Sequence, residues 1–205
     1  MSMLNEVYNS RILELAGNIP RLGRLASPDA TATAHSKLCG STVTVDLKME
    51  GDTVTDFSHD VKACALGQAS SSIMARHVVG SKSDELRSLR ETVRRMLKEN
   101  GAPPSGKWAD IAVLEPVRDY KARHASTLLT FDAVVDAIGK IEANSKREAV
   151  RKMLKENGAP PSGKWADIAV LEPVRDYKAR HASTLLTFDA VVSAIDQIEN
   201  KRNGG

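Results

Sequence analysis

One segment of this 205-residue chain occurs twice, because residues 96–135 recur without a single change as residues 153–192. Diverging solenoid repeats keep only their packing positions alike, whereas here loop, charge and turn residues are copied too. Two copies are also too few for a stacked array of repeats. We therefore predict one complete domain, residues 1–143, followed by residues 144–205 as a near-exact second copy of its C-terminal segment. A function has to be sought in the first part.

Composition excludes several classes of protein. The net charge is only +3, and cationic and anionic residues alternate along the chain, which gives no case for nucleic-acid binding. No segment approaches the apolar length of a membrane span, and Glu6 and Glu14 interrupt the region where a signal peptide would be apolar. We expect a cytoplasmic protein without membrane contact. In such a protein, Cys39 and Cys64 are more often thiols or metal ligands than a disulfide.

The hydrophobic pattern predicts a small sheet and several helices. Apolar and polar residues alternate over 42–49, a turn follows at 50–52, and extended character resumes over 53–61, which indicates an antiparallel hairpin. Residues 30–37 are a weaker candidate for a third strand. Helical spacing and stop signals predict helices over 4–16, 65–80, 83–100 and 126–142. The fold class is α+β, with a small antiparallel sheet of about three strands packed with helices.

Two of these helices have clear inner stripes, while the segment between them is predicted to be irregular over 101–123. The residues expected to be buried are Leu86, Leu89, Val93 and Leu97 in the first, and Leu128, Leu129, Val134, Val135, Ile138 and Ile141 in the last.

Residues 101–108, GAPPSGKW, match the first half of a phosphate-binding loop. A true loop of this kind has Ser or Thr after its lysine to hold magnesium, but Trp108 stands there. Pro103 and Pro104 remove amide donors, and the preceding segment is a helix instead of a strand. We therefore reject a nucleotide site.

Both cysteines are predicted at the ends of secondary-structure elements. Cys39 and Gly40 lie between two strands, and Cys64 lies where a strand gives way to a helix. Such positions suit metal or sulfur chemistry, because strand ends hold a thiol rigidly and a helix N-terminus stabilises a thiolate. His124, just before the last helix, offers an imidazole ligand. Taken singly, the two cysteines could equally be ordinary buried thiols, and the histidine could be a surface or helix-capping residue.

At this point the sequence resembles a known family. Residues 31–75, TATAHSKLCGSTVTVDLKMEGDTVTDFSHDVKACALGQASSSIMA, look like the core of the U-type iron-sulfur cluster scaffolds, the IscU, NifU and SufU group. The similarity includes ILELAGNIPRLGRL before this block and RHASTLLTFDAVVDAI after it, and it covers residues 4–142. The long interval between Cys64 and His124 is closer to the SufU-like branch.

The resemblance implies a carrier and not an enzyme, with no catalytic residue. Such a scaffold receives persulfide sulfur from a cysteine desulfurase, assembles a transient two-iron, two-sulfur cluster and passes it to recipient apo-proteins. The family's site has three cysteines and an aspartate, with a histidine beside the third cysteine in the IscU branch. Cys39, Cys64 and His124 match three of these positions and are the implied cofactor and metal ligands.

Two departures from the family pattern weaken this site. Ser41 replaces the aspartate, and Ala125 replaces the third cysteine. Ala125 coordinates nothing and Ser41 is a poor ligand, so three ligands remain where a two-iron cluster needs four. An alternative therefore stays open, in which the chain is a degenerate member that binds zinc or no metal and modulates a cysteine desulfurase.

The second copy allows a further expectation. It supplies another C-terminal helix, with His181 as the duplicate of His124, and both copies fit one groove on nearly equal terms. A domain-swapped homodimer is one outcome, and a tethered appendage is the other.

Overall fold

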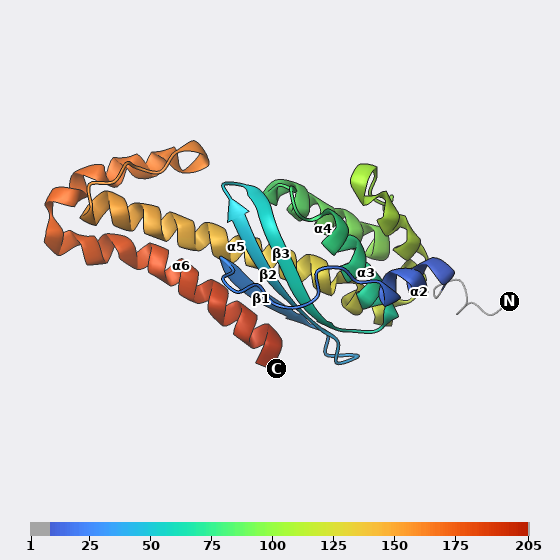
Figure 1. The fold of residues 1–205 in the computed structure, drawn as a ribbon. Coiled ribbons are helices and arrows are strands. Elements are labelled where there is room, and N and C mark those ends of the chain that lie inside the picture. The colour runs from blue at the N-terminus through green and yellow to red at the C-terminus, as the bar shows by residue number, and fades with distance from the viewer. Residues whose placement is uncertain (1–8, 205) are drawn as a thin grey trace. The chain divides into compact units, whose positions relative to one another are not determined.

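The computed structural model describes residues 9–204 and has an α+β fold, as predicted (Figure 1). Residues 4–8 of the first predicted helix lie outside the described residues. In chain order, the elements are α2 Ser10–Gly17, β1 Ala30–His35, β2 Thr42–Glu50, β3 Thr53–Lys62, α3 Ala65–His77, α4 Ser83–Lys98, the 3-10 helix η1 Gly106–Asp119, α5 Lys121–Lys155, the 3-10 helix η2 Gly163–Asp176 and α6 Lys178–Gly204.

The three strands form an antiparallel sheet in the order β1-β2-β3. Val45 in β2 pairs with Ala32 on one side and with His59 on the other. Gly51 has a φ of +59° in the turn between β2 and β3, a conformation that glycine adopts without strain. The buried apolar residues of β1 and β2 lie on one face, and they are Ala30, Ala32, Ala34, Val43, Val45 and Leu47. The predicted hairpin and third strand are confirmed.

The predicted inner stripe of α4 is buried in full, and that of α5 is buried except for Val135, which is half-buried. The prediction of an irregular segment over 101–123 was wrong, because residues 106–119 form η1 with Pro116 inside it. The indole Nε1 of Trp108 donates a 2.7 Å hydrogen bond to Glu85, and one side of η1 is buried. Tertiary packing therefore stabilises a helix that its glycine and proline content does not predict.

The last predicted helix continues past its expected end at residue 142. As α5 it runs to Lys155 without a break, passing Gly139 on the way. Residues 143–155 contain no proline or glycine and are rich in helix-forming residues, so nothing in the sequence stops the helix there.

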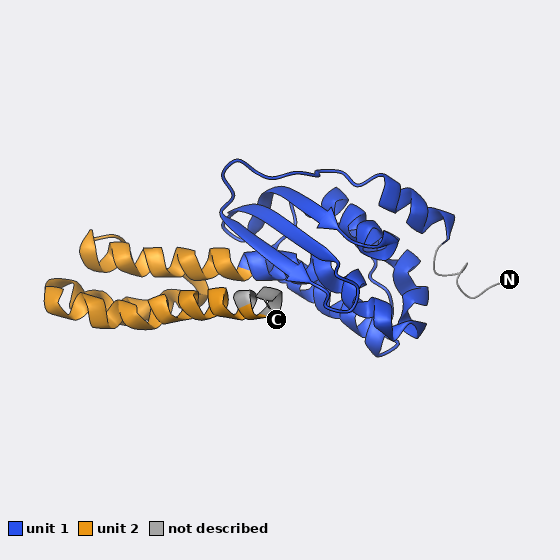
Figure 2. Cartoon of the chain, turned by 90° about the horizontal axis from the view of Figure 1, so that it is seen from below, with its two compact units in different colours: residues 1–138, 202–205 blue, residues 139–201 orange. Residues whose placement is uncertain are grey.

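The chain divides into two compact units, residues 1–138 with 202–205 and residues 139–201 (Figure 2). Unit 2 has its own apolar core, formed by Val150, Met153, Leu154 and Leu185, with Ile168, Leu171, Val174 and Phe188 packed against it. All but Val150 lie in the exact repeat, residues 153–192, and the eight correspond to buried residues of α4, η1 and α5. The second copy therefore rebuilds the packing of α4, η1 and α5 from its own residues.

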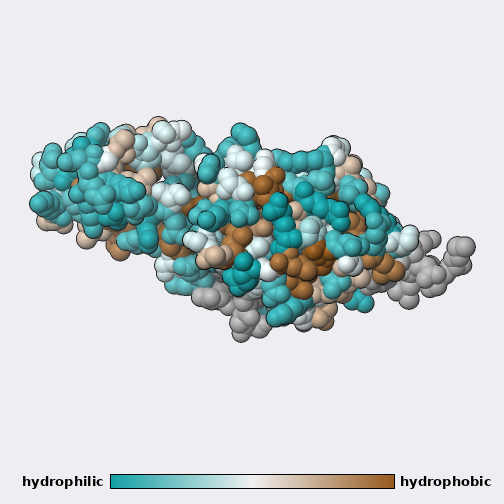
Figure 3. Space-filling model, viewed as in Figure 1, coloured by the Kyte–Doolittle hydropathy of each residue, from teal (hydrophilic) through white to brown (hydrophobic). Residues whose placement is uncertain are grey.

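Hydrophilic side chains cover most of the face seen in Figure 3, with hydrophobic residues in small patches among them. Within residues 9–204, no helix is both long and apolar enough to cross a membrane.

A buried carboxylate attaches the segment before β1 to the sheet. Asp46 of β2 has no exposed side-chain surface, and its oxygens accept hydrogen bonds from Arg24 at 2.6 and 2.8 Å. The Leu25 amide and the Thr31 hydroxyl also donate to it, at 3.0 and 2.6 Å. Burial raises the pKa of Asp46, but these donors outweigh it and hold the pKa below its ordinary value.

We predict that Asp46→Asn lowers the free energy of unfolding of unit 1 by about 2 kcal/mol at neutral pH, because charge-assisted hydrogen bonds are lost from a buried site. The contribution of Asp46 is present above the ordinary carboxyl pKa of about 3.9 and is lost as the pH falls through the lower folded value. The free energies of unfolding of the wild type and the variant should therefore converge at acid pH. The measurement is hydrogen exchange of the β2 amides at increasing urea concentration. Asp60→Asn, on an exposed carboxylate beside Lys62, is the control; an equal loss there would contradict the assignment.

Candidate functional site

Cys39 lies at the exposed tip of the loop between β1 and β2. The Ser36 amide donates to the Ser41 carbonyl at 2.8 Å, and the Gly40 amide donates to the Ser36 carbonyl at 2.9 Å. Gly40 has a φ of +67°, which closes this loop at a position where other residues would be strained. The thiol is therefore both accessible and held by a tight backbone.

The surroundings of Cys39 favour its thiolate. The thiol donates to the hydroxyls of Ser36 and Ser41 at 3.4 and 3.0 Å, and the same hydroxyls donate to the sulfur once it is ionised. Partial burial raises the pKa of Cys39, but these two hydroxyls, the Ser41 backbone and the charge of Arg123 outweigh it, so the pKa lies below its ordinary value. An accessible cysteine of lowered pKa is the nucleophilic kind.

Cys64 is the residue that precedes α3, at the N-terminus of that helix. It is half-buried, and its sulfur lies 3.5 Å from the hydroxyl of Ser126 in the second turn of α5. The two helices approach closely here. A Cβ at Gly67 would come within 3.0 Å of the Ser126 carbonyl oxygen and within 2.7 Å of the Ala63 Cβ. A small residue at position 67 therefore allows α5 to reach Cys64.

His124 is buried in the first turn of α5, and its ring faces the backbone of η1. Its Nε2 lies 3.2 Å from the Val117 carbonyl oxygen and 3.0 Å from that of Arg118. Because both partners are acceptors, Nε2 carries the hydrogen and only Nδ1 has a lone pair for a metal. His181 makes the same bond at 2.9 Å to Arg175, in a copy that contains no cysteine. The hydrogen bond from this histidine to the backbone of the preceding 3-10 helix therefore forms in a copy that has no thiol.

The structure brings Cys64 to the second turn of α5, where its sulfur meets Ser126, and the charge of Arg123 in the first turn favours the thiolate of Cys39. The structure does not add His124 to the two cysteines as a cluster, since among residues 9–204 no three His, Cys, Asp or Glu side chains are grouped for a metal ion. The ligand set Cys39, Cys64 and His124 stays a prediction. Ala125, where the family has its third cysteine, is exposed between Arg123 and Ser126.

Sequence reasoning missed three polar residues of this site, Ser36, Arg123 and Ser126. Their types are common on protein surfaces, and nothing in the local pattern separates them from solvated residues. Ser36 gains its role from the fold of its own loop around Cys39, and Ser126 gains its role because α5 packs closely beside α3.

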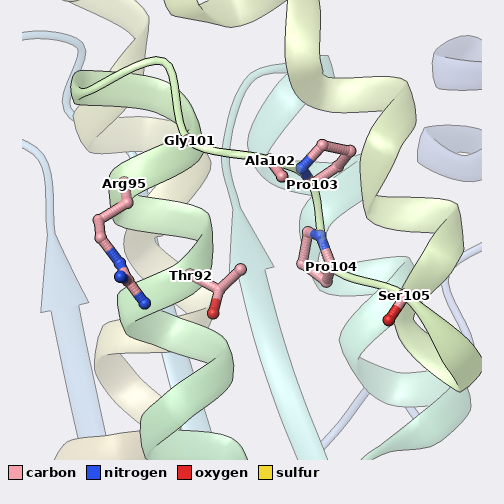
Figure 4. A pocket seen from close by; sticks show the side chains of 7 residues that line it. All are labelled: Thr92, Arg95, Gly101, Ala102, Pro103, Pro104 and Ser105. Carbon is pink, nitrogen blue, oxygen red and sulfur yellow. The ribbon is translucent and has the colours of Figure 1, made fainter.

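The rejected phosphate-loop match is not a phosphate site in the structure either. Lys107 Nζ lies 2.8 Å from a Glu85 carboxylate oxygen and 2.9 Å from the Ser81 hydroxyl, so its charge is already paired. A pocket of about 410 Å³ lies between α4 and the loop that follows it, and Figure 4 shows the side chains that line it. Its lining residues are Thr92, Arg95, Gly101, Ala102, Pro103, Pro104 and Ser105, and they include neither cysteine.

Comparison with known proteins agrees with this fold. Residues 7–127 match the model of the NifU-like N-terminal domain. The iron-sulfur cluster assembly scaffold protein IscU of Thermotoga maritima is 28% identical over 137 residues, which are 66% of this chain and 94% of that protein. The zinc-dependent sulfurtransferase SufU of Bacillus subtilis is 22% identical over 69% of this chain and 96% of its own length.

Among solved structures, the N-terminal part of a nitrogen-fixing NifU-like protein from Brucella abortus is 68% identical, with a TM-score of 0.68. The match covers 69% of this chain and 98% of that structure. A SufU-type protein from Fervidobacterium islandicum shares the fold at 19% identity, with a TM-score of 0.61, and the match covers 65% of this chain and 98% of that structure. The sequence block around Cys39 and Cys64, the sheet with its helices and the matched family model lead to one conclusion: the chain belongs to the NifU-like N-terminal domain family of U-type scaffold proteins.

Proposed function

We propose that this protein is a carrier in iron-sulfur cluster assembly that accepts sulfur from a cysteine desulfurase on Cys39. The observation that carries the proposal is the exposed Cys39 thiol, whose pKa is lowered by Ser36, Ser41 and Arg123 against the effect of burial. The names of the relatives, an assembly scaffold and a sulfurtransferase, support the same chemistry.

The transfer step is a thiol–persulfide exchange. The Cys39 thiolate attacks the outer sulfur of the donor's persulfide, a new S–S bond forms at Cys39, and the old S–S bond breaks. The donor cysteine leaves as a thiolate, and the proton of the persulfide stays on the transferred sulfur or passes to solvent. No external oxidant or reductant is needed. Ser36 and Ser41 donate to the attacking sulfur, and Arg123 offsets its negative charge.

The cluster itself is a cargo of this site. Two thiols and the Nδ1 atom of His124 provide at most three protein ligands, while a two-iron cluster takes four. The fourth ligand has to come from solvent, a small thiol or a partner, so we expect a cluster that is easily lost. A cysteine at position 125 would lie exposed in the same helical turn and would supply the missing thiol.

A second candidate function is a metal-free or zinc-binding partner that modulates a cysteine desulfurase. Two cysteines and a histidine are donors that zinc accepts. As arranged, the two cysteines and His124 form no grouped metal site among the described residues. This protein would change the rate of the desulfurase without taking up sulfur.

Sulfur transfer can be measured directly by mass spectrometry. After incubation with a cysteine desulfurase and free cysteine, we expect the chain to gain the mass of one sulfur atom on Cys39. Cys39→Ser should abolish this gain, while Cys64→Ser, the matched control, should retain it. Altered desulfurase turnover with no added sulfur would favour the modulator. Sulfur found only on Cys64 would contradict the proposal.

We expect cluster binding to become stronger when a cysteine is restored at position 125. After anaerobic reconstitution with ferrous iron and sulfide, Ala125→Cys should retain more iron and more visible charge-transfer absorption than the wild type, because the third thiolate returns. Ala182→Cys, at the same position of the second copy, is the control and should change neither quantity. Equal retention in all three proteins would contradict the ligand assignment.

The reactivity of Cys39 should follow its lowered pKa. In the Cys64→Ala background, the rate of alkylation by iodoacetamide should reach its half-maximal value below about pH 8.5, the ordinary value for a cysteine. Ser41→Ala should move this midpoint to higher pH, because one donor to the thiolate is lost. A midpoint at or above 8.5 before that substitution would show that burial dominates.

A further inference from the structure

Residues 18–25, which we call the strap, lead away from α2 and run beside β3. Leu22 of the strap forms a parallel bridge with His59 of β3, the last strand of the sheet. The Gly23 amide donates to the His59 carbonyl oxygen at 2.9 Å, and the His59 amide donates to the Arg21 carbonyl oxygen at 3.2 Å. An open edge strand offers such main-chain groups to other chains, so the strap protects the sheet at this point.

The side chain of His59 makes a third bond to the strap. Its ring is fully buried, and Nε2 lies 3.0 Å from the carbonyl oxygen of Pro20. Because a carbonyl only accepts, Nε2 carries the hydrogen and Nδ1 keeps a lone pair. This Nδ1 is buried and has no hydrogen-bond partner, and the ring stands edge-on to Phe57 with 4.9 Å between centroids. A neutral imidazole in an apolar setting therefore makes the bond.

The charged groups around the ring do not compensate a positive charge on it. Asp60, the next residue of β3, favours the protonated ring, but its side chain is exposed to solvent. Burial outweighs Asp60 and the Pro20 carbonyl and holds the pKa of His59 below its ordinary value. The charged side chains of the strap, of β2 and of α3 are engaged elsewhere: Arg21 with Asp56, Arg24 with Asp46, and Arg76 with the Asn18 carbonyl.

The backbone of the strap is strained beside this bond. Arg21 has a φ of +59°, a left-handed conformation that residues with a side chain rarely adopt. Such a conformation persists only where the surrounding structure holds it. Here the bonds of His59 to Pro20, Arg21 and Gly23 hold the strained residue from both sides. Loss of the ring's bond therefore favours the release of the whole turn.

We propose that His59 is a pH-dependent latch, which holds the strap on the edge of β3 while its ring is neutral and releases the strap when the ring is protonated. Protonation adds an N–H group and a charge at the buried Nδ1, where no acceptor is available. The ring can take up the proton at low cost only when the strap has opened and water reaches it. Release uncovers the main-chain groups of His59 at the edge of the sheet.

The direction of the pH dependence follows from the lowered pKa of the closed form. The open form has the ordinary histidine pKa of about 6.5, so the closed strap is fully stable above that pH. As the pH falls from there towards the lower pKa of the closed form, the open form binds more protons and its population rises about tenfold per pH unit. Asp46, which also holds the strap, titrates in a separate and more acidic range.

Hydrogen exchange of the Gly23 amide in the full-length protein tests the latch. Its protection factor, which removes the intrinsic pH dependence of exchange, should be constant above about pH 6.5 and fall about tenfold per pH unit below it. The Val54 amide is the control, because it donates at 2.9 Å to the Ser81 carbonyl on the same strand, away from the strap. A constant protection factor at Gly23, or an equal fall at Val54, would overturn the inference.

Two matched variants separate the latch from a general effect of acid. His59→Phe keeps an aromatic ring that neither charges nor bonds Pro20, so protection at Gly23 should be lower than in the wild type above about pH 6.5 and independent of pH. His35→Phe, on β1 beside the Thr42 hydroxyl, should retain the dependence of the wild type. The opposite pattern in the two variants would contradict the assignment.

The ring nitrogens of the wild type provide a measurement that needs no variant. Their NMR shifts should place the hydrogen of His59 on Nε2 at neutral pH and show half-protonation below about pH 6.5. Half-protonation at or above that value, or a hydrogen on Nδ1, would show that the ring does not hold the strap in the way proposed.

Discussion

The close contact between α3 and α5 is the constraint on which the site depends. Gly67 allows the backbone of α5 at Ser126 to approach α3, and no side chain fits between them. This contact sets the start of α5 beside Cys64, so that Ser126 meets its sulfur, and the charge of Arg123 on the same helix helps to lower the pKa of Cys39. The same contact distinguishes the two copies, because unit 2 contains a copy of α5 but no copy of α3.

Regular alternation made the sheet predictable, since a hairpin with one buried face has a period of two in its sequence. The 3-10 helix was not predictable from composition. Its glycine and its proline are typical of loops, and it forms because Trp108 donates a hydrogen bond to Glu85 while Ile111, Leu114 and Val117 are buried. In the local sequence, such tertiary contacts are visible only as scattered apolar residues, which do not by themselves predict a helix.

From the sequence, we expected the second copy either to compete for the groove of the last helix or to remain a tethered appendage. The sequence analysis did not predict that it has an apolar core of its own. The signal was present, because residues 148–152, EAVRK, resemble residues 91–95, ETVRR, just before the exact repeat begins. With them the copy brings the end of α4 as well as η1 and α5. The ion pairs of Arg94 with Glu91 and Glu99 recur for Arg151 with Glu148 and Glu156.

The positions of the cysteines at element ends were readable from the sequence, because strand and helix boundaries determine them. The orientation of His124 was not readable, since its partners are backbone carbonyls that carry no sequence signature. Its duplicate His181 shows that this bond forms without the thiols.

The most direct test of this account uses the identity of the two copies. Amides of residues 128–134 and 185–191 have the same sequence and the same neighbours, so their intrinsic exchange rates are equal and any difference reports packing. Hydrogen exchange resolved by NMR should show slower exchange in the first segment, and Gly67→Ala should speed exchange there without changing the second. Equal protection of the two segments, or a Gly67→Ala effect on both, would contradict the claim that α3 determines which copy builds the site.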